Sequence, residues 1–404
     1  MKTKFQCRLT SALSTLSVAA VTNTRKLLLT LSGLALAASM SVQAQVKIGV
    51  MASSTGPIAF VGIPQKNAVA LLPKKIGEYS IEYLVFDDAS DPTQSVQLTK
   101  KLLGENKIDA LIGPSGSGNA MGVLAFMAEG QTPMLAPVGT SAVVLPMDDK
   151  KRWVFKTHPN DDVISEGLVA AMTKRGVKTV GFIGRNDPYG ENWYKTFAPM
   201  AQTAGIQIVA NERYNQQDTS VVAQALKLIA AKPDAILVAG VAADAALPHT
   251  QLTDSGYKGA IFQTHGAASS AFIKIGGKKV EGALIVGPLL AVPDEIPDGF
   301  PTKKITLDMV TSYEKQFGSK PPIFAAGTYD AGLLLMRAIP EAAKKGKPGT
   351  QEFRTALRDA LEGTKEMLAS QGVITMTAKD HSGFDHRGRV LMTVKDGKFS
   401  LVKD

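Results

Sequence analysis

Residues 112–119, Ile-Gly-Pro-Ser-Gly-Ser-Gly-Asn, limit most narrowly what this chain can fold into. They follow a short apolar run, 110–112, that predicts a buried strand, and they precede a segment, 120–129, that predicts a helix. A glycine-rich turn at this position is typical of an open α/β sheet, which binds ligands at the carboxyl ends of its strands. Glycine lets the backbone approach a ligand closely, and a helix start offers unpaired N–H groups to an anion. The loop therefore predicts an α/β fold with a site for a small anion, with a plain tight turn as the alternative.

Three well-known loop patterns fail here by one or two residues. A P-loop requires Lys followed by Ser or Thr where Asn119 and Ala120 stand, and a dinucleotide-binding loop requires a glycine where Met121 stands. A nucleophile elbow requires glycines two residues either side of its serine, and neither Ser115 nor Ser117 has both. The loop matches no specific nucleotide or hydrolase motif.

Strands and helices alternate through most of the chain, which predicts parallel, doubly wound sheets. The predicted strands cover residues 46–51, 81–86, 110–112, 133–136, 153–156, 179–183, 207–209, 235–238, 260–262 and 283–286. The predicted helices include residues 93–103, 220–231, 303–317, 324–345 and 351–361, and a β-hairpin is expected over 390–402. Asp91 is expected to cap the first of these helices, and Asp218, Thr219 or Ser220 the second. The two series of strands and helices suggest paired lobes.

The first 44 residues predict an export signal. Arg25 and Lys26 precede an apolar run, 27–38, and Val42-Gln43-Ala44 is a small-x-small cleavage site. The apolar run is too short to favour a membrane anchor. We therefore expect cleavage after Ala44 and a mature protein in the periplasm of a Gram-negative cell.

Removal of this signal changes the charge and the thiol content. The segment carries five basic residues and no acid, so the formal net charge falls from +9 to +4. That charge gives no argument for nucleic acid as a partner. The single cysteine, Cys7, lies in the same segment, so the mature chain has no thiol for a disulfide, a metal site or a nucleophile.

Six short motifs carry a family resemblance when they are taken in order. They are Lys47-Ile-Gly-Val50 with Thr55-Gly-Pro-Ile-Ala-Phe-Val-Gly62, Asp87-Asp-Ala-Ser-Asp-Pro92, Ile112-Gly-Pro-Ser-Gly-Ser117, Ala136-Pro-Val-Gly-Thr140, Asn186-Asp-Pro-Tyr-Gly190 and Ala326-Gly-Thr-Tyr-Asp330. Together they resemble the periplasmic solute-binding proteins of branched-chain amino acid type, which are the receptors of ABC importers. The resemblance runs over nearly the whole mature chain.

The resemblance implies a type I periplasmic binding protein fold, with two Rossmann-like lobes joined by a three-segment hinge and a ligand in the cleft. The hinge crossings would fall near 155–158, 286–290 and 375–380. The N-terminal lobe would then comprise 45–156 plus 288–376, and the C-terminal lobe 157–287 plus 377–404. Closure of the lobes over the ligand would be recognised by an inner-membrane permease. The resemblance implies no catalysis, cofactor or metal, and we expect a monomer.

The resemblance also assigns site residues. The family's carboxylate-binding serine and threonine fall on Ser117 and Thr140, within turns that include Ser115, Gly116 and Val138. Ordinary helix capping is the alternative role for both hydroxyls. Tyr189 falls on an aromatic position that closes over the ligand from the second lobe, whereas Phe324 and Phe60 fall on or beside aromatic walls and could instead be plain core residues.

The departures from the family pattern concern the half of the pocket that binds an ammonium group. His265 stands where an acid pairs with the ligand's ammonium, and Val241 and Val61 stand where tyrosines are common. Burying an ammonium without a partner costs several kcal/mol. We therefore expect a small carboxylate without an amine, an aromatic acid above all, with a branched-chain or other apolar amino acid as the alternative. A shift of a few residues in the alignment would bring Asp244 into the cleft and restore an acid.

Two further function classes find less support in the sequence. An exported hydrolase would need a nucleophile beside a base, and none of the five histidines stands beside a recognisable nucleophile motif. A sensor of the same fold would need a membrane span or an effector domain, which the pattern does not predict.

Overall fold

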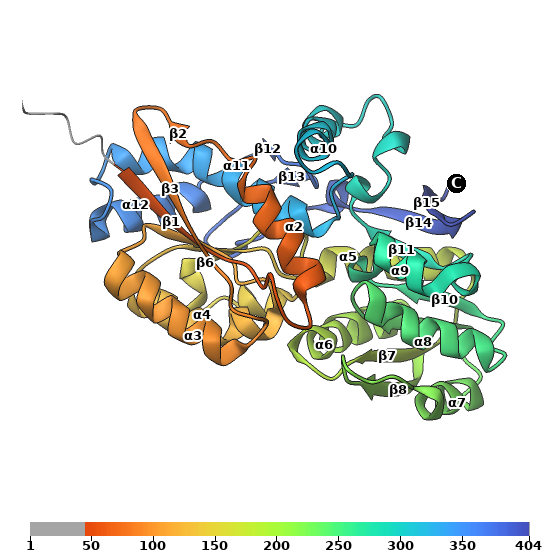
Figure 1. The fold of residues 1–404 in the computed structure, drawn as a ribbon. Helices are drawn as coiled ribbons and strands as arrows, with labels where there is room; N and C mark the ends of the chain where they lie inside the picture. The colour runs from red at the N-terminus through yellow and green to blue at the C-terminus, as the bar shows by residue number, and fades with distance from the viewer. Residues whose placement is uncertain (1–44, 404) are drawn as a thin grey trace, which may run out of the picture. The chain divides into compact units, whose positions relative to one another are not determined.

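The computed structural model describes residues 45–403, so the predicted export signal, 1–44, lies outside the described residues. Within them the chain forms two large sheets, each with helices on both faces (Figure 1). This is the doubly wound α/β architecture that the alternating pattern predicts. None of the described helices is long and apolar enough to cross a membrane.

The first sheet has six strands in the order β2-β3-β1-β4-β5-β6. Their bounds are β1 Gln45–Met51, β2 Lys75–Ile76, β3 Tyr79–Phe86, β4 Ala110–Ile112, β5 Met134–Ala136 and β6 Val154–Lys156. Strands β1, β4, β5 and β6 are parallel, so their carboxyl ends meet at one edge. The helices of this half are α2 Ala59–Val69, α3 Pro92–Lys101, α4 Ser117–Glu129, α10 Lys303–Phe317, α11 Phe324–Ala343 and α12 Gln351–Glu362.

The second sheet has seven strands in the order β15-β14-β11-β10-β9-β7-β8. Their bounds are β7 Thr179–Arg185, β8 Gln207–Tyr214, β9 Ala235–Ala239, β10 Ala260–Gln263, β11 Leu284–Gly287, β14 Val390–Lys395 and β15 Lys398–Leu401. Strands β7 to β11 run parallel, and the predicted C-terminal hairpin adds β14 antiparallel to β11 and β15 antiparallel to β14. The helices of this half are α5 Asp161–Lys174, α6 Pro188–Thr203, α7 Val222–Ala230, α8 Ala243–Asp254 and α9 Ser270–Gly276.

The side chains of a strand point alternately to the two faces of its sheet, and helices cover both faces. The apolar strands are therefore buried on both faces. In the first sheet Ile48 and Leu135 pack toward α11 and α12, while Leu111 and Met134 pack toward α3 and α4. Helix α3 begins as predicted, since the Asp91 carboxylate accepts from the backbone N–H groups of Thr93 and Gln94.

The predicted cap of α7 is wrong. The helix begins at Val222 after Val221, which has no capping side chain. The Asp218 carboxylate instead accepts from the Asn215 N–H in the preceding loop, and the Val221 N–H donates to the Gln251 side chain. Tertiary contacts therefore replace the local cap.

The third passage between the sheets comes later than residues 375–380. The Lys156 N–H donates to the His381 carbonyl over 2.8 Å, and the His381 ring stacks on Phe155 at a centroid distance of 4.3 Å. Phe384 also belongs to the core beneath the first sheet. The segment therefore stays with the first sheet until after Phe384, because the His381 ring and backbone pair with β6.

Candidate ligand-binding site

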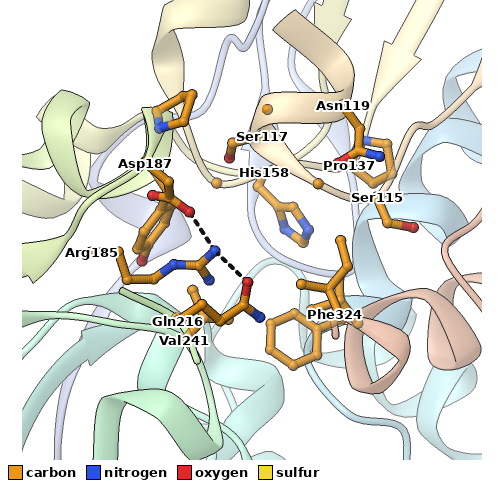
Figure 2. Close-up of a pocket in the computed structure, with 18 of the residues that line it drawn as sticks. Ser115, Ser117, Asn119, Pro137, His158, Arg185, Asp187, Gln216, Val241 and Phe324 are labelled. Atoms are coloured by element: carbon orange, nitrogen blue, oxygen red, sulfur yellow. Dashed lines mark hydrogen bonds and ion pairs between the residues drawn. The ribbon is translucent and has the colours of Figure 1, made fainter. Parts of the chain in front are cut away.

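A cavity of about 300 Å³ lies between the two sheets, where loops from the carboxyl ends of their strands face each other. Figure 2 shows Ser115, Ser117 and Asn119 on one side of it, Arg185 and Asp187 on another, and His158 between them. Such a crevice is the usual place for a ligand in an open α/β sheet.

Seven of the ten predicted site residues line this cavity: Ser115, Gly116, Ser117, Tyr189, Val241, His265 and Phe324. Phe60 does not, since it packs edge-to-face against Phe324 with ring centroids 6.0 Å apart. Val138 and Thr140 do not line it either, although their neighbours Pro137 and Gly139 do. Val138 is buried in the core under α4, and the buried Thr140 hydroxyl accepts from the Ala142 N–H, so both side chains turn inward.

The loop before α4 is held by a buried carboxylate. Asp88 accepts hydrogen bonds from the Ser53 hydroxyl (2.6 Å), the Ser95 hydroxyl (2.7 Å) and the Asn119 amide (3.0 Å). Gly116 is the N-cap of the helix, and a side chain there would lie 2.5 Å from Asn119 Oδ1. The tight packing therefore requires glycine and fixes the direction in which α4 begins.

The two serines of this loop have different roles in the structure. The Ser115 hydroxyl accepts from the Ser53 N–H at 3.0 Å, so it helps to build the loop. The Ser117 hydroxyl has no hydrogen-bond partner among residues 45–403, and Ser117 is the first residue of α4. The free hydroxyl and the first N–H groups of the helix together form a site suited to an anion.

Tyr189 and His265 enter the cavity from the second sheet. The Tyr189 hydroxyl bonds Thr264 Oγ1 at 2.8 Å, and its ring lies so near Gly139 that a side chain there would meet it at 2.5 Å. Burial lowers the pKa of His265 well below 6.5, and nearby Lys156 and His158 add to the effect. The His265 ring is therefore neutral, and its Nδ1 has no partner among the described residues.

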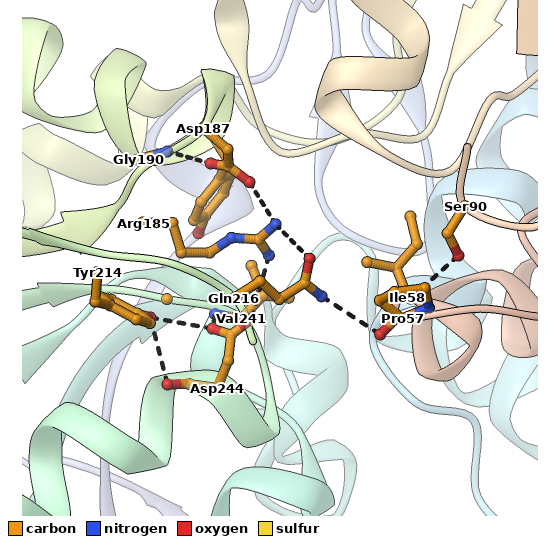
Figure 3. Close-up of polar contacts among 12 residues, drawn as sticks. Pro57, Ile58, Ser90, Arg185, Asp187, Gly190, Tyr214, Gln216, Val241 and Asp244 are labelled. Carbon is orange, nitrogen blue, oxygen red and sulfur yellow. Dashed lines mark hydrogen bonds and ion pairs between the residues drawn. The ribbon is translucent and has the colours of Figure 1, made fainter. Parts of the chain in front are cut away.

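Asp244 does not line the cavity. Its carboxylate accepts from Arg185 Nη1 (3.2 Å), the Tyr214 hydroxyl (3.1 Å) and the Val241 N–H (2.7 Å), as Figure 3 shows. Asp187, the one carboxylate that lines the cavity within the described part of the chain, pairs with the same guanidinium. Both acids therefore contact the one guanidinium, and neither stands in the cavity without a basic partner.

Sequence reasoning missed several lining residues, among them His158, Arg185, Gln216 and Gln371. His158 follows the predicted strand 153–156 by two residues, so its position at the same sheet edge as Ser117 was a usable signal. Gln371 arrives from a distant segment, and no local pattern marks it.

Comparisons with known proteins agree with this fold. A family model described as a periplasmic binding protein matches residues 45–398. An extracellular ligand-binding receptor from Rhodopseudomonas palustris HaA2 has a solved structure that is 41% identical, with a TM-score of 0.85, covering 89% of this chain and 100% of that one. The Leu/Ile/Val-binding protein BraC3 of Rhizobium johnstonii is 26% identical over 343 residues, which cover 82% of this chain and 87% of that protein.

A more distant structure supports the fold alone. LivJ from Streptococcus pneumoniae, solved in complex with isoleucine, is 20% identical, with a TM-score of 0.73, and the match covers 89% of this chain and 100% of that one.

Proposed function

The chain belongs to the periplasmic binding protein family, and we propose that it captures a small carboxylate without an amine for an ABC importer. As a member of this family it is a binding protein and not an enzyme. The permease would be its protein partner, and hinge closure of the two lobes would enclose the ligand.

One observation supports a ligand with a carboxylate group. Helix α4 begins at the cavity wall with Ser117, whose hydroxyl has no partner among residues 45–403. An anion there would receive hydrogen bonds from the hydroxyl and from backbone N–H groups, each worth about 1.5–3 kcal/mol to a charged group. Phe324, Tyr189 and Val241 supply apolar walls for the body of the ligand, and an aromatic ring fits these contacts.

The lack of a free acid supports a ligand without an amine. Asp187 is engaged by Arg185, and His265 is neutral, so the cavity has no unpaired negative group for an ammonium among its described lining residues. A second candidate is a branched-chain amino acid, because curated relatives such as the Leu/Ile/Val-binding protein BraC3 carry that name.

A binding panel on the dialysed protein separates these candidates. We expect thermal shift and calorimetry to show binding of benzoate-type or aliphatic acids and no binding of leucine or isoleucine. Micromolar leucine binding without any response to the amine-free acids would overturn the proposal in favour of the amino acid.

The lobe division stays part of the proposal. We propose the division expected from the sequence, 45–156 plus 288–376 and 157–287 plus 377–404, with one change: residues 377–384 belong to the N-terminal lobe, because His381 pairs with β6 and Phe384 lies in the core of the first sheet. Export to the periplasm after cleavage at Ala44 is proposed on the pattern of the first 44 residues.

A further inference from the structure

A buried chain of hydrogen bonds fixes the orientation of the Gln371 amide. Its Nε2 lies 2.9 Å from the Thr157 carbonyl oxygen and 2.9 Å from Asp330 Oδ2. A backbone carbonyl has no proton to donate, so the Gln371 atom that faces it must be the NH₂ group. The other terminal atom, Oε1, is therefore an acceptor only.

The orientation of Gln371 fixes the tautomer of His158. Gln371 Oε1 lies 2.5 Å from His158 Nδ1, so Nδ1 must carry the proton of this hydrogen bond. Burial and the nearby charge of Lys156 together lower the pKa of His158 to about 4, against a smaller opposing effect of the Gln371 hydrogen bond. The ring is therefore neutral near pH 7, and Nε2 carries an unshared electron pair.

The His158 ring lies at the wall of the cavity, next to α11. Figure 2 shows the His158 ring reaching between Ser117 and Phe324, and His158 is one of the lining residues. A side chain on Gly327 would lie 2.6 Å from Nε2, so the glycine leaves room for the ring. Across residues 45–403 no hydrogen-bond partner of Nε2 is present.

We propose that His158 selects a carboxylate whose body carries a hydroxyl group, by accepting that hydroxyl's proton in a hydrogen bond to Nε2. This inference rests on the proposed function and adds a second recognition element to it. An ionised carboxylate oxygen cannot take this position, because two electron pairs would face each other. The carboxylate must therefore lie elsewhere, and Ser117 offers the free donor.

An ammonium group fits this position less well than a hydroxyl. A neutral imidazole accepts one hydrogen bond but leaves the positive charge uncompensated, and the cavity's Asp187 already pairs with Arg185. A ligand without any donor would bury Nε2 unpaired, which lowers affinity by about tenfold relative to the hydroxylated ligand.

The first experiment needs no ligand. In the folded, ¹⁵N-labelled protein at pH 7, two-bond nitrogen–proton correlations report which imidazole nitrogen carries the proton. Comparison with the spectrum of His158→Phe assigns the resonances of His158. We expect a neutral His158 ring protonated at Nδ1. Protonation at Nε2, or a charged ring, would overturn the inference whatever the protein binds.

The second experiment compares matched acids by calorimetry: benzoate, its three monohydroxy derivatives and the three corresponding methoxy derivatives. We expect at least one hydroxy acid to bind about tenfold more tightly than benzoate and than its methoxy analogue. In His158→Phe this preference should fall to within about twofold. An unchanged preference in that variant, or equal affinity for all seven acids, would contradict the role of His158.

His249→Phe is the matched control. His249 is also buried, burial lowers its pKa to about 4 as well, and it bonds Gln263 outside the cavity lining. This variant should keep the hydroxyl preference, whereas its loss in both variants would count against the inference. If no amine-free acid binds the wild-type protein, the proposed function fails, and the nitrogen resonances alone decide the tautomer of His158.

Discussion

Ser117 is the residue on which the carboxylate proposal depends most directly. Its hydroxyl has no partner among the described residues, and it stands at the first position of α4 beside the cavity. We expect Ser117→Ala to weaken binding of the amine-free acid by about tenfold, the loss of one hydrogen bond to a charged group. Calorimetry checks this, and unchanged affinity in a folded variant would remove Ser117 from the site.

Substitution of Thr140 tests whether its buried capping hydroxyl also contributes to ligand binding. Its hydroxyl accepts from the Ala142 N–H at 3.2 Å, so Thr140→Ala should lower the free energy of unfolding by about 1 kcal/mol, as the loss of a cap does. Because Thr140 does not line the cavity, we expect the affinity to change by less than about twofold, whereas a ligand contact such as the family resemblance implies would cost about tenfold. Thr140→Ser is the control and should keep both properties. A stability loss without any loss of affinity would leave capping as the sole role.

At the scale of elements, the start of α4 depends on the carboxylate of Asp88. Three side chains donate to it, so Asp88→Asn would place an NH₂ group against donors and leave at least one of them unpaired. We expect the free energy of unfolding to fall by about 2–4 kcal/mol in urea titrations. Asp91→Asn is the matched control, because asparagine caps a helix about as well as aspartate does, and it should change stability by about 0.5 kcal/mol at most. Equal effects of the two substitutions would contradict this role of Asp88.

Strand β6 ends in a fully buried lysine, Lys156, whose ionisation makes the stability of the protein depend on pH. Burial lowers the pKa of Lys156 to about 8, although Asp161 and Asp162 oppose the shift. Between this pKa and the unfolded value near 10.5, the unfolded chain binds more protons, so stability rises with pH. From pH 8 to 9.5 the rise from this group is about 1.5 kcal/mol.

Lys156→Met should remove that rise, which denaturant titrations at several pH values would show as a difference from the wild type. Titration only to pH 9.5 keeps most tyrosine ionisation of the unfolded chain outside the range. Parallel stability curves for the two proteins would contradict a lowered lysine pKa.

The elements themselves were largely predictable, and the contacts between distant segments were not. The strands at 110–112 and 235–238 are buried on both faces, so they are continuous apolar runs that a local pattern reveals. The same logic placed Ser117 at a sheet edge. In contrast, His158 and Gln371 are 213 residues apart in the sequence and form a hydrogen bond because the chain returns to the first sheet. The spacing of apolar residues within a segment does not predict such a return. Thr140 shows a third case, in which the turn was predicted but the inward direction of its side chain was not.

At the scale of the whole molecule, the two halves contact each other directly at two separate places. Asn192 on α6 donates to the Ser141 hydroxyl over 2.9 Å, and both side chains also bond the buried carboxylate of Asp161. Elsewhere Gln216 donates to the Pro57 carbonyl over 3.3 Å (Figure 3). If the proposed hinge closure brings the two halves together, it forms these contacts, which would then favour the closed arrangement independently of any ligand.

Asn192 provides the sharpest test of that coupling, because it does not line the cavity. Removing its amide should lower the fraction of molecules that are closed, and the apparent affinity falls in proportion to that fraction. We therefore expect Asn192→Ala to weaken ligand binding by about three- to tenfold, mainly through faster dissociation, as expected for the loss of one or two hydrogen bonds. Small-angle scattering of the unliganded variant should show a larger radius of gyration than the wild type. Lys195→Ala, on the exposed side of the same helix, is the control and should change neither quantity. If Asn192→Ala left both the affinity and the radius of gyration unchanged, the contact with Ser141 would not contribute to closure, and the ligand alone would have to supply the free energy that holds the lobes together.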